Sequence, residues 1–96
     1  MSLQSARFAG DAELEACLNG ANKLKLGSTG PAVAKIQRAL IDLGHLLARF
    51  GADGKFGSET AAAVRGFQNS KSLRPIDAVI GAQTMRALDG ALPPRP

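Results

Sequence analysis

Hydrophobic residues recur with the period of an α-helix in several stretches of the chain. The clearest stretch covers residues 31–43, in which apolar side chains return at intervals of three and four: Val33, Ile36, Leu40 and Leu43. Pro31 suits the first helical position, where its missing N–H has no partner to lose. Gly44 is placed to end the helix in a left-handed conformation. The pattern therefore predicts a helix over residues 31–43.

Three more stretches predict shorter helices. One runs from about Ser58, a possible N-cap, to Asn69, and another from about Ala82 to Leu88. A third lies near residues 11–18, with Asp11 as its cap. The connections are rich in glycine, and the one strand-like alternation is the four-residue run 23–26. We therefore predict an all-α protein with ordered loops.

The predicted helix phases also define a core around Phe67. The companions expected to share it are apolar residues from all the central elements: Val33, Ile36, Leu40, Phe56, Val64, Ile80 and Leu88. Gly66, inside the second helix, costs up to about 1 kcal/mol relative to alanine. This cost suggests either close approach by another element or a neutral substitution.

An internal repeat carries more information than any single helix. Residues 53–64 align with residues 77–88 in the pattern D-x-x-h-G-x-(E/Q)-T-x-x-A-h, where h is hydrophobic. Each aspartate, Asp53 or Asp77, is expected to accept backbone N–H bonds within its own turn. The hydrophobic position, Phe56 in the first copy, is expected to fill the core. Two loops of one design therefore lead into two helices.

The glycines, threonines and glutamines of this repeat have expected structural roles. Gly57 and Gly81 precede the helices and are expected to allow a positive φ. Thr60 and Thr84 are expected to bond locally in the first helical turn. In a separate pair of positions, Gln37 and Gln68 each follow an apolar anchor at the edge of a buried stripe, where an amide can tie the backbone of a loop. Ligand contact is the alternative role for these two glutamines.

One position departs from this symmetry. Gly54 follows Asp53, whereas Ala78 follows Asp77. If the two turns share a conformation, Ala78 must either avoid a positive φ or carry strain of about 1 kcal/mol.

Length and composition limit the class of protein. The chain has 96 residues, of which 45% are hydrophobic and 21% charged, as in a single small globular domain and unlike a disordered chain. We expect no membrane span, because no apolar run approaches about 20 residues. The N-terminus lacks the apolar segment of a signal peptide. A formal charge of +4 favours anionic partners such as nucleic acid, anionic lipid or an acidic wall polymer.

The residue inventory argues against an enzyme. One cysteine and one histidine cannot form a disulfide or a two-histidine zinc site, so we expect no metal and no cofactor. Cys17 is expected to be a small buried residue, and His45 has no catalytic partner at a diagnostic spacing. The carboxylates are expected on helix surfaces or within turns, which does not suit acid–base catalysis.

These motifs together resemble the small peptidoglycan-binding domain family, three-helix modules found on many cell-wall hydrolases. The resemblance spans residues 24–88 and rests on three groups of segments in family order: 26–33, 36–40 and 43–44; 52–60, 63–64 and 67–68; 76–84 and 87–88. It implies a compact orthogonal three-helix bundle with glycine-rich loops. Ala78 and the slightly long loop at residues 45–52 depart from the family pattern, and both alter loop surfaces where a ligand could bind.

The resemblance also implies an organisation and a function. Residues 1–23 form an N-terminal extension with a short extra helix, residues 24–90 the binding domain, and residues 91–96 a flexible Pro-rich tail. Similar extensions accompany such modules on larger chains, including ones linked to contractile injection particles. The expected function is non-catalytic binding of peptidoglycan by a part of, or a module tethered to, a cell-wall hydrolase or larger assembly. The cell envelope or the exterior is the expected location.

The residues proposed to contact the ligand come from the helix phases. Arg38, Lys55 and Arg65 are the cations expected to face outward near the loops, and Asp53 is a further candidate. The alternative is that these charges form a solvated face. A protein-docking adaptor is an alternative function. Binding of nucleic acid is not expected, because the cations are scattered and the four phenylalanines are the only large aromatic residues.

Overall fold

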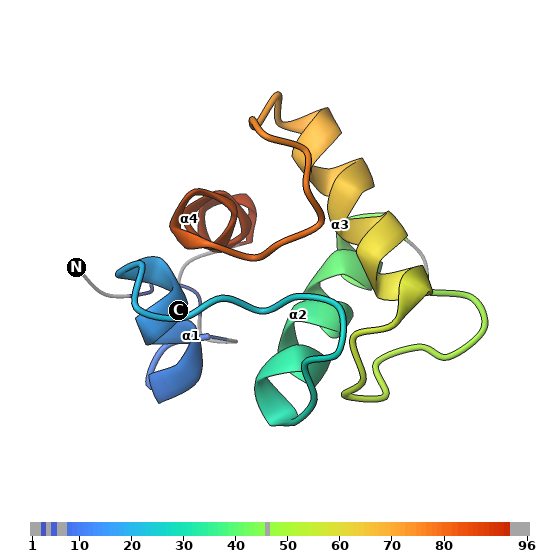
Figure 1. Ribbon diagram of the computed structural model, residues 1–96, viewed down its shortest axis with the longest axis horizontal. Helices are drawn as coiled ribbons and strands as arrows, with labels where there is room; N and C mark the ends of the chain where they lie inside the picture. Colours follow the sequence, from blue (N-terminus) through green and yellow to red (C-terminus); the bar gives the residue numbers. More distant parts are fainter. Residues whose placement is uncertain (1–2, 4, 6–7, 46, 93–96) are drawn as a thin grey trace.

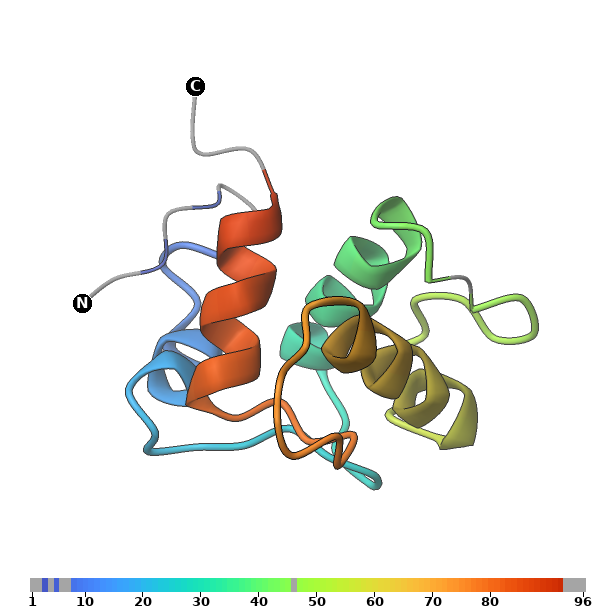
Figure 2. The ribbon, with the colours of Figure 1, turned by 90° about the horizontal axis from the view of Figure 1, so that it is seen from above.

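The structure is a computed structural model that describes residues 3, 5, 8–45 and 47–92. These ranges hold four α-helices: α1 (Ala12–Leu18), α2 (Pro31–Asp42), α3 (Ser58–Ser70) and α4 (Ala82–Ala91). α1 packs against α4 and α2 against α3, and the two pairs stand next to each other (Figure 1, Figure 2). The expected all-α fold with an extra N-terminal helix is confirmed. Within the described ranges, every helix is too short or too polar to cross a bilayer.

Two helix boundaries follow directly from capping chemistry. The Asp11 carboxylate accepts the N–H groups of Glu13 and Leu14 at 3.0 and 3.1 Å, which satisfies two of the free donors at the start of α1. Pro31 is the first residue of α2, and Gly44 follows its end at φ 95°. These three predictions are confirmed.

Two boundaries differ from those predicted. Gly57, not Ser58, is the N-cap of α3, because the Gly57 carbonyl already accepts the first helical bond, from Ala61 N–H at 2.9 Å. α4 continues beyond Leu88 to Ala91 because its last turn has its own apolar anchor. Ala91 packs against the core and Leu92 is buried. The segment expected to be a tail is therefore packed at its first two residues, and residues 93–96 lie outside the described part of the chain.

The predicted core is confirmed. Phe67 is 1% exposed, and all seven predicted companions are buried. Its ring meets the His45 imidazole edge to face, with 5.9 Å between the centroids. A Cβ added at Gly66 would lie 3.2 Å from His45 Nδ1, so the close approach suggested for this glycine is present.

The N-terminal segment belongs to the same core, which the sequence analysis did not predict. Phe8 and Leu14 are fully buried in one cluster with Met85 of α4. The Ser5 N–H also donates to Asp89 Oδ1 of α4 at 2.7 Å. Residues of the N-terminal extension therefore stabilise the helix that carries the second copy of the repeat.

Candidate functional site

The loop before α3 is held by one buried side chain of α2. Gln37 Nε2 lies 2.9 Å from both the Lys55 carbonyl and Thr60 Oγ1 and 3.1 Å from Asp53 Oδ1. Gln37 Oε1 accepts the Gly54 N–H at 2.8 Å. We call these five residues the first glutamine network. It fixes the turn relative to both helices.

The loop before α4 repeats this arrangement with a residue of α3. Gln68 Nε2 lies 3.1 Å from Asp77 Oδ1, the Val79 carbonyl and Thr84 Oγ1, and Gln68 Oε1 accepts the Ala78 N–H at 3.0 Å. These five residues form the second glutamine network. Both glutamines are buried and committed to the protein, so the structural role predicted for them is confirmed. The threonines bond to these glutamines, a longer-range contact than the local one expected.

The aspartates and apolar residues of the repeat behave as predicted. Asp53 Oδ1 accepts the Lys55 N–H, and Asp77 Oδ1 accepts the Val79 N–H, each at 3.0 Å. Phe56, and Ile80 at the matching position of the second copy, are both buried.

The glycines of the repeat do not behave as predicted. Gly57 and Gly81 have φ of −104° and −99°, so a positive φ is not what they supply. They serve as N-caps, a position at which glycine is well tolerated. The left-handed residues are instead Gly54, at φ 78°, and Ala78, at φ 62°. The strained alternative for Ala78 is therefore the one that the structure adopts.

The segment of residues 24–30, which contains a turn closed by the Ser28 N–H on the Lys25 carbonyl at 2.9 Å, contacts both loops. Leu24 and Ile80 exchange two backbone hydrogen bonds at 2.8 and 3.2 Å. Phe56 accepts from Gly27 and donates to Ser28, both at 2.9 Å. This segment ties the two copies of the repeat to each other.

The four predicted contact residues are all exposed. Asp53 and Lys55 share the first turn, while Arg38 lies beside Gln37 on α2 and Arg65 lies on α3. The Lys55 N–H and then the Gln37 amide lower the pKa of the Asp53 carboxyl below its ordinary value. Asp53 is therefore ionised at neutral pH and partly used by its own turn.

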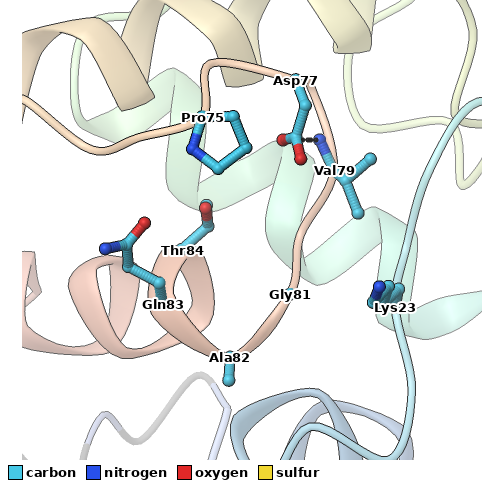
Figure 3. Close-up of a pocket in the computed structure, with 8 residues that line it drawn as sticks. All are labelled: Lys23, Pro75, Asp77, Val79, Gly81, Ala82, Gln83 and Thr84. Carbon is cyan, nitrogen blue, oxygen red and sulfur yellow. Dashed lines mark hydrogen bonds between the residues drawn. The ribbon is translucent and has the colours of Figure 1, made fainter.

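A hollow is found at the second loop instead. A pocket of about 170 Å³ is lined by Pro75, Asp77, Val79, residues 81–84 and Lys23 (Figure 3). In Figure 3, Lys23 stands on a separate segment, and Asp77 lies at a different edge of the pocket. A second hollow of about 340 Å³, lined by residues 20–23 and Lys25, also includes Lys23.

The sequence analysis did not assign this pocket. Asp77 and Thr84 were expected to be structural, and Lys23 was placed in the extension. The alternating run 23–26 held part of the signal, because Lys23 and Lys25 are exposed on either side of Leu24, which is 1% exposed. The alternation ends there, since Leu26 is 65% exposed. The pattern did not indicate that the second loop lies beside Lys23.

The single cysteine of the sequence lies in the hydrophobic core. Cys17 is buried, and burial, with the nearby Glu13 and Asp11 charges, raises the pKa of its thiol to about 11. It is a packing residue, as predicted. No group of three or more potential metal-ligating side chains occurs in the described ranges.

Comparison with known proteins places these features in a family. The sequence pattern of the peptidoglycan binding domain matches residues 29–88, which include both glutamine networks. The type VI secretion system spike protein VgrG3 of Vibrio cholerae is 38% identical over 82 residues, covering 75% of this chain and 8% of that protein. The N-acetylmuramoyl-L-alanine amidase CwlL of Bacillus licheniformis is 37% identical over 65 residues, covering 68% of this chain and 18% of that protein.

A solved structure agrees with the sequence relatives. The SleB N-terminal domain superposes with a TM-score of 0.66 at 33% identity, covering 73% of this chain and 92% of that one. The chain thus spans less than a fifth of the two sequence relatives but nearly all of this isolated domain. With the pattern match, the repeat and the fold in agreement, the chain belongs to the peptidoglycan-binding domain family.

Proposed function

We propose that this domain binds peptidoglycan without cleaving it and holds a larger protein at the cell wall. The observation that carries the proposal is the family match over residues 29–88, which contains both glutamine networks and the loops that they fix. Because fold alone does not establish function, the contact surface has to be argued from its chemistry.

Arg38, Lys55 and Arg65 are the proposed contacts at the first loop. All three are exposed, and peptidoglycan offers carboxylates on its stem peptides. Asp53 contributes through the part of its carboxylate that the turn leaves open, where it can accept from ligand amides or hydroxyls. Single exposed ion pairs are worth at most about 1 kcal/mol. Binding should therefore be modest and should weaken as salt is added.

The absence of catalysis is part of the proposal, and the roles of the carboxylates support it. Asp53 and Asp77 hold their own turns. The Glu59 carboxylate accepts the N–H groups of Arg49 and Phe50 at 2.8 and 3.0 Å. Incubation with peptidoglycan should release no soluble fragments, and their release would contradict this part of the proposal.

Tethering explains how weak binding can be useful. A module that stays near the wall raises the effective concentration of any domain joined to it, without needing tight affinity of its own. The match covers 18% of the amidase relative, so most of that protein lies outside the shared domain.

The proposal is tested by pelleting with purified sacculi from which attached anionic polymers have been removed. At low salt the domain should co-sediment, and an Arg38→Ala/Lys55→Ala/Arg65→Ala variant with an unchanged helical spectrum should stay largely in the supernatant. A parent that stays soluble, or a shift of labelled duplex DNA at lower concentration than wall binding requires, would contradict the proposal.

A protein-docking adaptor is the second candidate function. The observation that favours it is the match to the VgrG3 spike protein, whose name places that relative in a secretion system. This match spans 82 residues, whereas the match to the amidase spans 65. The two functions separate cleanly in the sacculus experiment, since an adaptor has no need to pellet.

A further inference from the structure

The pocket at the second loop has a wall that the family match does not include. Lys23 lines it, but the match begins at residue 29. Leu24, the next residue, is fixed by its two hydrogen bonds to Ile80, so the backbone that carries Lys23 is held beside the second loop. The pocket therefore combines the loop inside the matched region with a lysine outside that region.

The pocket presents both signs of charge. Lys23 and Asp77 line it, yet within the described residues they form no ion pair with each other, and the Lys23 ammonium has no carboxylate partner. Asp77 Oδ1 already accepts from Gln68 and Val79, and a carboxylate has further acceptor sites. A ligand group that carries its own ammonium and carboxylate would complement this pair.

The start of α4 adds donors to the same pocket. Residues 82–84 line it, and the first helical bond of α4 is made by the Met85 N–H to the Gly81 carbonyl at 2.9 Å. The N–H groups of the preceding three residues have no partner within the helix. They complement an anionic oxygen in the same way as Lys23 does.

The size of the pocket limits what can enter it. Sites that enclose a whole drug-sized ligand have volumes of about 300–1,000 Å³, whereas this one has about 170 Å³. It therefore suits one end of a larger molecule. The second hollow shares Lys23 with the pocket, so the rest of that molecule has room next to it.

We infer that this pocket binds the free end of a peptidoglycan stem peptide. The terminal carboxylate lies toward Lys23 and the start of α4, the amino group lies toward Asp77, and the glycan stays outside. The inference rests on the proposed function and specifies which part of the polymer is recognised.

A titration with a soluble stem tripeptide ending in meso-diaminopimelic acid tests the inference. In amide NMR spectra of the full chain, the resonances of Lys23, Val79 and Gly81 should shift with peptide. The same peptide with its carboxylates amidated should shift them weakly, and a soluble N-acetylglucosamine oligomer should not shift them. Shifts that gather around Lys55 instead, or no shifts at all, would overturn the assignment.

A substitution pair tests the role of the lysine. Lys23→Gln should weaken peptide binding about fivefold, the value of one exposed ion pair. Lys71→Gln, an equal charge change at an exposed residue outside the pocket, should leave it unchanged. Equal affinities of Lys23→Gln and the parent would overturn the assignment.

The outcome with sacculi separates this inference from the proposed function. If the parent pellets with sacculi but the peptide leaves the pocket resonances in place, the pocket assignment fails and wall binding stands. If the peptide shifts the pocket resonances but the parent does not pellet, the ligand chemistry stands and wall binding fails.

Discussion

The loops that lead into α3 and α4 have the same internal hydrogen bonds but different surroundings. In each, a buried glutamine of the preceding helix holds an aspartate, two backbone groups and a threonine. The left-handed position is glycine in the first loop and alanine in the second. A Cβ at Gly54 would lie 3.3 Å from the Gly30 carbonyl oxygen, whereas Ala78 already carries its Cβ in a buried position.

This difference shows which features the turn requires to keep its conformation. The second glutamine network holds a non-glycine residue at φ 62°, although this conformation costs about 1–2 kcal/mol. Glycine is needed where a neighbouring backbone also approaches, as Gly30 does at residue 54. The hydrogen bonds, rather than glycine, define the turn.

The outer surfaces of the two loops differ as well. Glu59 binds two amides of the loop at residues 47–52, next to the start of α3. Gln83, which matches Glu59 in the repeat, is exposed and lines the pocket. One scaffold therefore supports two different surfaces, and ligand recognition depends on the residues that the scaffold leaves free.

The largest expected effect comes from the core that both loops share. Phe67→Ala should lower the free energy of unfolding by about 3–5 kcal/mol, because it removes a fully packed ring. Thermal or urea unfolding measures this. Phe50→Ala is the control, since Phe50 is 61% exposed and should change stability by less than about 0.5 kcal/mol. A Phe67→Ala domain that melts within a degree or two of the parent would contradict the core assignment.

Removing each glutamine network tests whether the two loops are equivalent. Gln37→Met and Gln68→Met keep a similar volume but leave buried polar groups unpaired, at about 1–3 kcal/mol for each such group. We expect similar losses in urea unfolding for the two variants. A loss below about 0.5 kcal/mol in either one would show that the network on that side does not hold its loop.

Exchanging the residues at the left-handed positions should have opposite effects in the two loops. Gly54→Ala should destabilise by about 1–2 kcal/mol for the left-handed conformation alone, and crowding of the Gly30 carbonyl adds to this. Ala78→Gly should stabilise by up to about 1 kcal/mol, because relief of strain exceeds the added unfolded-state entropy of about 0.4–1 kcal/mol. Unfolding curves of both variants decide the point, and destabilisation by Ala78→Gly would contradict the strain at residue 78.

The smallest effect concerns pH. Because folding lowers the pKa of Asp53, its contribution to stability is complete above the ordinary value of 3.8 and is lost as pH falls through the folded-state value. Asp53→Asn should therefore lose less stability than the parent between about pH 4 and pH 2. Parallel acid-unfolding curves for the two proteins would show that the carboxylate contributes nothing to the turn.

Much of this architecture could be predicted from the sequence because it depends on local chemistry and periodicity. The repeat identified both aspartate turns, and the helix phases identified the burial of Phe67. The same reasoning misplaced the need for positive φ at Gly57 and Gly81, since spacing alone does not say which residue of a turn is left-handed. The pocket depends on a contact between Leu24 and Ile80, 56 positions apart along the chain, and no local pattern brings Lys23 to Asp77.

The central claim is that this scaffold binds peptidoglycan. Its most direct test is a pelleting assay of the unmodified domain with increasing amounts of purified, polymer-free sacculi. The bound fraction should saturate as sacculi are added at low salt, fall as salt is raised, and exceed that on an uncharged insoluble polysaccharide. A domain that remains in the supernatant at low salt, or that binds both materials equally, would contradict the claim.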